Sequence, residues 1–151
     1  AEQLTGKAVG ANWRPAFDKA YGLSFLWGLV IALGLGTAWF LTGPLLIGLM
    51  TTNAEVQAYA LAYLPIAALC ALTFMPAFVY DGILIGTTLN TTMRNGMIVS
   101  LLVFLAAAAV LQPAWGNWGL WAALHAWFIA RGVIYAWALQ RRRAALFTAP
   151  A

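Results

Sequence analysis

The carboxylate of Asp81 is the first side chain in this sequence that could carry chemistry, because it lies alone in a long apolar segment. No other charged residue occurs between Val56 and Met93. Counting back from Arg94 places Asp81 roughly 12 Å inside a membrane-spanning helix, where an ionisable group is costly and is by default a functional candidate. A carboxylate at that depth can bind a proton or an alkali cation. The alternative is an acid near the interface that only ends its helix.

The residues around Asp81 suit a binding site. Gly82 and Gly86 form a pair of small residues four positions apart, which lets another backbone approach closely. Pro76 interrupts the helix hydrogen bonds and frees the carbonyl of Leu72, which lies where it could help to coordinate a cation. We therefore expect Pro76, Gly82 and Gly86 to shape a cation site at Asp81.

Two further ionisable residues lie in the last apolar stretch. Arg131 is expected about 12–15 Å deep, and Trp127 and Tyr135 lie one turn away on either side, where they can cover its guanidinium group. A structural role for Arg131 is favoured over a catalytic one, and an ion pair with Asp81 would neutralise both charges. His125 is interpreted as a hydrogen-bonded core residue, with a role as proton relay as the alternative.

Motifs for enzyme chemistry are absent from the sequence. The pair Asp81-Gly82 could begin a lipid-head-group transferase motif, but such enzymes need several spaced carboxylates for a divalent metal. The membrane part of this chain offers one. The sequence has no G-x-S-x-G elbow and no P-loop, and its one cysteine, Cys70, excludes a multi-cysteine metal site. We expect no enzyme activity, no cofactor and no metal site.

Composition defines the class of protein that must position these residues. Hydrophobic residues make up 64% of the 151 residues and charged residues only 8%, too little polar surface for a soluble domain and too much apolar surface for a disordered chain. The eight Lys and Arg residues form no basic stripe that could bind nucleic acid. The sequence predicts an all-α polytopic membrane protein in a lipid bilayer.

Four stretches are long and apolar enough to cross the bilayer. They are expected at about 21–41, 56–89, 95–112 and 118–140, after a polar cytoplasmic lead-in of residues 1–20. Gly43-Pro44 and Gln112-Pro113 are expected to end the first and third spans, and Asn53 is expected to cap the start of the second. The second span is either one long helix kinked at Pro65 and Pro76 or a helix followed by a tail.

The basic residues predict the orientation. Seven of the eight fall on one side of a four-span topology: Lys7, Arg14, Lys19, Arg94, Arg141, Arg142 and Arg143. The opposite loops, residues 43–53 and 113–117, contain none, so both termini and the loop at 89–94 are expected in the cytoplasm. The chain begins at Ala1 with no cleavable signal segment, and we expect it to come from the inside of a longer protein.

A family resemblance rests on several motifs. Residues 80–88, YDGILIGTT, followed by Met93-Arg94-Asn95, resemble the tenth-helix signature of the multidrug and toxic compound extrusion (MATE) family, especially its DinF-like branch. Residues 6–11 resemble the segment that closes the eighth helix of that family. Residues 116–121 and 130–132 resemble the start and middle of its last helix. The resemblance covers nearly the whole chain.

This resemblance implies a fold and a function. Family members have twelve helices in two six-helix lobes and export organic cations or other toxic compounds in exchange for Na⁺ or H⁺. The chain would then supply helices nine to twelve of the second lobe, with the remaining helices as its partners. Asp81 matches the tenth-helix aspartate that contributes to cation binding in the Na⁺-coupled branch. That branch has a tyrosine one turn earlier, where this sequence has Ala77, and coupling in the DinF-like branch is usually ascribed to a first-lobe aspartate.

The function predicted from the resemblance is that of a cation-coupled efflux antiporter of the bacterial inner membrane, of which this chain is a C-terminal fragment. One alternative is a stand-alone four-helix small multidrug exporter that acts as a dimer. Such exporters carry an essential glutamate in the first span, and the first span here has no acid. The other alternative is a membrane assembly subunit without transport activity, which uses its glycines and aromatic residues to pack against partner helices.

Overall fold

The computed structural model describes residues 1–147, which form helices and no strands. The elements are α1 (Glu2–Gly10), α2 (Arg14–Met50), α3 (Ala54–Gly86), α4 (Asn90–Trp115), α5 (Asn117–Arg142) and a short 3₁₀ turn, η1 (Ala145–Phe147). Helices α2 to α5 are each long and apolar enough to cross a membrane. The predicted all-α membrane fold with four spans is therefore confirmed.

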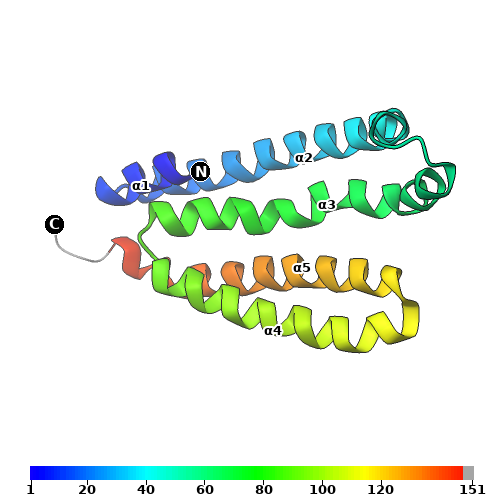
Figure 1. The fold of residues 1–151 in the computed structure, drawn as a ribbon. Helices are drawn as coiled ribbons and strands as arrows, with labels where there is room; N and C mark the ends of the chain where they lie inside the picture. Colours follow the sequence, from blue (N-terminus) through cyan, green and yellow to red (C-terminus); the bar gives the residue numbers. More distant parts are fainter. Residues whose placement is uncertain (148–151) are drawn as a thin grey trace.

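The four spans form two neighbouring pairs that meet through α3 and α5 (Figure 1). Helix α2 lies along α3, α4 lies along α5, and α1 packs against both α2 and α3. The turn between α1 and α2, the end of α5 and the turn between α3 and α4 lie at one end of the molecule, on the left of Figure 1. Because α1 ends, α2 and α4 begin, and α5 ends at this side, the seven basic residues used for the orientation gather there.

Two helices continue through the prolines that were expected to end them. Helix α2 runs past Gly43-Pro44 to Met50, and α4 runs past Gln112-Pro113 to Trp115. A proline removes one backbone donor, but in an apolar environment every other backbone group must still be satisfied within the helix. A helical backbone beyond the proline meets that requirement, so the expectation that these prolines end the spans was wrong.

The boundaries near the chain's start and at the second turn also differ from those expected. The lead-in contains helix α1, and its last residues, 14–20, already belong to α2. The second span is a single helix that continues through Pro65 and Pro76 and ends at Gly86. The segment 90–94, expected in a loop, forms the start of α4, so the connection is only Thr87 to Leu89.

Backbone hydrogen bonds at the helix ends explain these sharp turns. After α3, the amide of Thr88 donates to the Ile85 carbonyl at 3.0 Å and the amide of Leu89 donates to the Leu84 carbonyl at 2.8 Å. This pattern is a Schellman motif, in which the residue after the C-cap adopts a left-handed conformation. Thr88 has that conformation, with a φ of 57°.

The end of α1 has the same motif, and Asn12 occupies its left-handed position with a φ of 49°. The start of α3 is capped as predicted. The Asn53 Oδ1 atom accepts hydrogen bonds from the amides of Glu55 at 2.9 Å and Val56 at 3.3 Å. Side chains of low helix propensity therefore stand at the helix ends, where their local hydrogen bonds are favourable.

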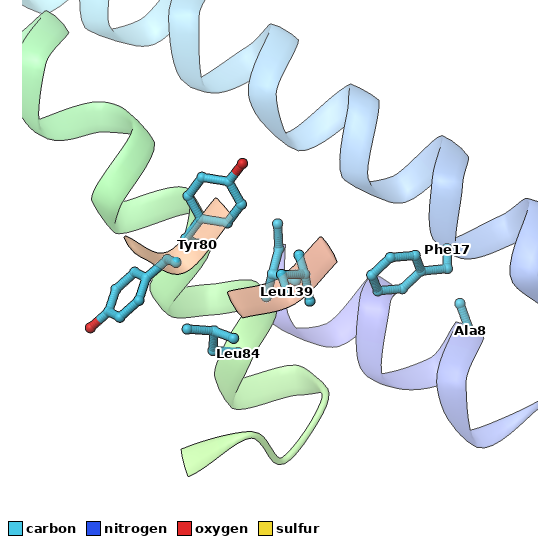
Figure 2. Packing of buried hydrophobic residues seen from close by; sticks show 7 residues of the cluster. Ala8, Phe17, Tyr80, Leu84 and Leu139 are labelled. Carbon is cyan, nitrogen blue, oxygen red and sulfur yellow. The ribbon is translucent and has the colours of Figure 1, made fainter. Parts of the chain in front are cut away.

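The buried core lies beside the turn between α1 and α2, and Figure 2 shows its packing from close by. It joins α1, α2, α3 and α5 through Ala8, Phe17, Tyr80, Ile83, Leu84, Tyr135 and Leu139. Most large apolar side chains elsewhere on the spans are exposed, which fits faces that meet lipid or other helices. The core holds the segment next to Asp81 in place, because Tyr80 precedes that residue directly.

Candidate functional site

The central polar feature of the molecule is an ion pair between α3 and α5. The Arg131 Nη2 atom donates to Asp81 Oδ2 at 2.6 Å. The Arg131 side chain is 9% exposed and the Asp81 side chain 18% exposed. The structure thus brings together the two ionisable residues that the sequence placed deep in separate spans, and their opposite charges compensate each other there.

Further contacts hold the guanidinium group of Arg131. Its Nε atom donates to the Tyr135 hydroxyl at 3.2 Å, and that hydroxyl donates to the Met93 carbonyl at 3.1 Å. The guanidinium carbon lies 5.5 Å from the ring centre of Tyr135 and 5.9 Å from that of Phe128. These contacts connect α3, α5 and α4 through a single chain of polar interactions.

One oxygen of Asp81 remains without a partner. Oδ2 is bound by Arg131, whereas Oδ1 is buried and accepts no hydrogen bond from any described residue. A buried carboxylate oxygen without a donor is unusual, because the lost hydration is not replaced. The free lone pairs of Oδ1 are where a proton or a small cation can bind.

The glycines beside Asp81 make room for α1. A methyl group at Gly82 would lie 3.1 Å from the Ala1 side chain, and one at Gly86 would lie 2.7 Å from the Thr5 hydroxyl oxygen. On the α1 side of the same contact, a methyl group at Gly6 would lie 2.9 Å from the Gly86 carbonyl oxygen. The backbone that approaches these two glycines is therefore that of α1, which packs against the segment of α3 that contains Asp81.

Pro76 lies where α3 meets α5. A methyl group at Gly132 would lie 3.5 Å from the Pro76 side chain, so the proline packs against the residue that follows Arg131. Ala77, where the Na⁺-coupled branch has a tyrosine, is fully buried in this interface. The aromatic hydroxyl near the site comes instead from Tyr135 on α5.

His125 lies deeper in the same interface, and the interpretation as a hydrogen-bonded core residue is confirmed. The ring is 8% exposed. Its Nδ1 atom lies 2.7 Å from the Thr73 hydroxyl, and its Nε2 atom lies 3.2 Å from the Ile66 carbonyl and 3.8 Å from the Cys70 sulfur. Residues 1–147 contain no group of three or more His, Cys, Asp or Glu side chains that could bind a metal.

Sequence reasoning missed part of this arrangement. Trp127 was expected to cover Arg131, but its indole N–H donates to Ser100 at 3.2 Å, and Phe128 covers the guanidinium instead. The role of Gly96 was also missed: a methyl group there would meet the Tyr135 ring, with Cδ1 at 2.9 Å. A glycine two residues after Arg94 was the only available signal for this close approach.

The fold and the buried ion pair define an all-helical integral membrane protein with a polar site between packed spans. A sequence model described as MatE matches residues 1–111, and the chain belongs to this family, as the motifs at residues 80–88 indicated. The family consists of secondary transporters and not of enzymes.

A curated relative agrees with the family match. The chain is 31% identical over 149 residues to DNA damage-inducible protein F of Escherichia coli (strain K12), and the match covers 93% of this chain and 30% of the relative. The chain therefore spans less than a third of the length of that protein. No solved structure shows a significant match to the present chain.

Proposed function

We propose that this chain is the C-terminal part of a cation-coupled multidrug and toxic compound efflux antiporter, and that it supplies helices nine to twelve. Family membership and the 30% share of the relative's length support this assignment. The four spans expose large apolar side chains on most of their surface, which the bilayer and the remaining helices of the transporter would cover. The substrates would be organic, partly cationic, small molecules.

The coupling ion, H⁺ or Na⁺, binds at Asp81 in this proposal. The observation that carries it is the buried Oδ1 atom, which has no partner while Oδ2 holds Arg131. A proton or Na⁺ on the carboxylate reduces its attraction for the guanidinium group and so weakens a contact between α3 and α5. Ion binding would then favour a different arrangement of these helices, as alternating access requires.

The proposed location is the inner membrane of a bacterium, with both termini in the cytoplasm. The turn between α1 and α2, the end of α5 and the short α3–α4 turn lie at the same end of the helices (Figure 1). That end carries seven of the eight basic residues. Lys and Arg near the ends of spans favour the cytoplasmic side.

The experiment that tests this function is ion-driven dye export by the full-length transporter in everted membrane vesicles. Asp81→Asn removes the charge and keeps the size of the side chain, so we expect export driven by a pH or Na⁺ gradient to be lost. The matched control is Asp18→Asn, because Asp18 pairs with Arg143 outside the apolar stretch and its side chain is 45% exposed. Unchanged export in the Asp81 variant would refute the coupling role.

Two gradients applied separately assign the ion. A pH gradient without Na⁺ drives export if the ion is H⁺, and a Na⁺ gradient at equal pH drives it if the ion is Na⁺.

The fragment assignment is tested by the gene: an upstream reading frame that encodes the remaining spans supports it. A start site directly before Ala1 would favour the stand-alone dimer or the assembly subunit.

A further inference from the structure

We propose that His125, together with the Thr73 hydroxyl and the Ile66 carbonyl, forms a second proton-binding site between α3 and α5. The ring is 8% exposed and both of its nitrogens face polar atoms of α3. The positions of these two polar partners support proton binding at His125. Its use in transport rests on the proposed function.

The neutral imidazole is fully satisfied in one tautomer. The Ile66 carbonyl can only accept, so Nε2 carries the proton and donates to it at 3.2 Å. Nδ1 is then an acceptor, and the Thr73 hydroxyl donates to it at 2.7 Å. The neutral ring therefore donates one hydrogen bond to α3 and accepts one from it.

The same arrangement satisfies the protonated ring without movement of any heavy atom. The imidazolium donates from Nε2 to the Ile66 carbonyl and from Nδ1 to the Thr73 oxygen. The Thr73 hydroxyl hydrogen then needs another acceptor, and its own helix provides two. The Leu69 carbonyl lies at 3.3 Å and the Cys70 carbonyl at 3.4 Å. Rotation of the Thr73 hydroxyl thus replaces the donor that Nδ1 needs when the ring is neutral by the acceptor that it needs when the ring is charged.

A pocket lies next to the side chains that pack against His125. A cavity of about 720 Å³ between α2 and α3 is lined by Cys70 and Phe74. The sulfur of Cys70 lies 3.8 Å from Nε2, and the ring of Phe74 packs beside the imidazole with centroids 5.8 Å apart. Two side chains that line the pocket therefore lie against the ring.

Among the described residues, no unpaired positive charge in contact with His125 opposes its protonation. From α3, Cys70 is the titratable side chain in contact with the ring. On α5, Arg131 lies six residues further on and is paired with Asp81. Helix α4 has one charged side chain, Arg94, in its second turn, and the apolar stretch of α2 after Lys19 has none. No unpaired cation in these helices therefore contacts the imidazole among the described residues.

The two proton sites lie at different depths. His125 precedes Arg131 by six residues, which corresponds to about 9 Å along the helix axis. Thr73 precedes Asp81 by eight residues, or about 12 Å. The inferred site is thus nearer the middle of the membrane than the Asp81 carboxylate, and it is a separate site on the same helix interface.

The test is ¹⁵N NMR of histidine-labelled full-length transporter in lipid vesicles between pH 4 and pH 9. The His125 signals are assigned by their loss in His125→Gln. We expect the wild-type ring to change from imidazolium to the neutral tautomer protonated at Nε2 within this range. Thr73→Val removes the hydroxyl oxygen that accepts from the charged ring. In this variant the midpoint of the His125 titration should fall by about one pH unit, a tenfold loss of proton affinity.

Two variants control for indirect effects. Thr73→Ser keeps the hydroxyl and should retain the wild-type midpoint. Thr42→Val makes the same chemical change at an exposed hydroxyl that donates only to the Ala38 carbonyl of its own helix, and it should leave the His125 midpoint unchanged. A ring that stays neutral throughout, a neutral ring protonated at Nδ1, or equal midpoints in the two valine variants would each overturn the inference.

The outcome is independent of the coupling role of Asp81. Because NMR detects the proton on His125 directly, it does not require transport. Loss of export in Asp81→Asn with no titration at His125 would refute only the second site. Titration at His125 with unchanged export in Asp81→Asn would refute only the proposed coupling role.

Discussion

Removal of one partner of the Asp81–Arg131 pair should destabilise the fold more than removal of both. Arg131→Met keeps the long apolar stem but leaves the Asp81 carboxylate without a donor on either oxygen, because Oδ1 has none to begin with. Breaking a buried pair in this way costs about 3–5 kcal/mol. Since the Asp81 side chain is still 18% exposed, we expect about 3 kcal/mol.

The double variant Asp81→Asn/Arg131→Met removes both charges. It should recover most of the loss and lie within about 1 kcal/mol of the wild type, because replacing a whole buried pair by neutral groups is often nearly neutral. Asp81→Asn alone leaves Arg131 its bond to Tyr135 and its aromatic neighbours. We expect that single variant to be less destabilised than Arg131→Met.

The assay is the free energy of unfolding of the full-length transporter in detergent micelles, measured for both single variants and the double variant. The control is Arg143→Met, because the Arg143–Asp18 pair lies outside the apolar stretches with side chains 32% and 45% exposed. A surface pair contributes about 0–1 kcal/mol, so this change should be small. A double variant as unstable as Arg131→Met would refute the reasoning.

Two further predictions concern backbone positions. Thr88→Gly should raise the free energy of unfolding by about 1 kcal/mol, because a β-branched residue is strained at a φ of 57°. Thr42→Gly, in regular helix, should lower it, and a lower value for the Thr88 variant would contradict the Schellman assignment. Gly96→Val should displace the Tyr135 ring and cost about 1–3 kcal/mol in thermal unfolding measurements. Gly34→Val is the control, because a side chain there meets open space, and equal stability of the two valine variants would refute the contact.

Sequence reasoning was strongest where one segment decides the outcome by itself. Apolar runs of about 20 residues predict helices because no other structure satisfies the backbone in lipid. Asn53 predicted the start of α3 because its side chain bonds to amides two and three residues away. The signature at residues 80–88 predicted the family, which the match over residues 1–111 shows.

The same reasoning failed where a local preference competes with the environment. Pro44 and Pro113 predicted helix ends, yet α2 and α4 pass through both residues. Each proline costs one hydrogen bond, whereas ending the helix inside an apolar region exposes several unsatisfied backbone groups. The larger cost decided the structure.

The sequence by itself determined that this is a helical membrane protein of the MATE family with an isolated carboxylate in its second span. Only the tertiary structure decided that Oδ2 of Asp81 binds Arg131 while Oδ1 stays free, and that Thr73 meets His125. Asp81 and Arg131 are 50 residues apart in the chain. Whether two such side chains meet depends on how α3 and α5 are rotated about their axes, and the packing of both helices together sets that rotation.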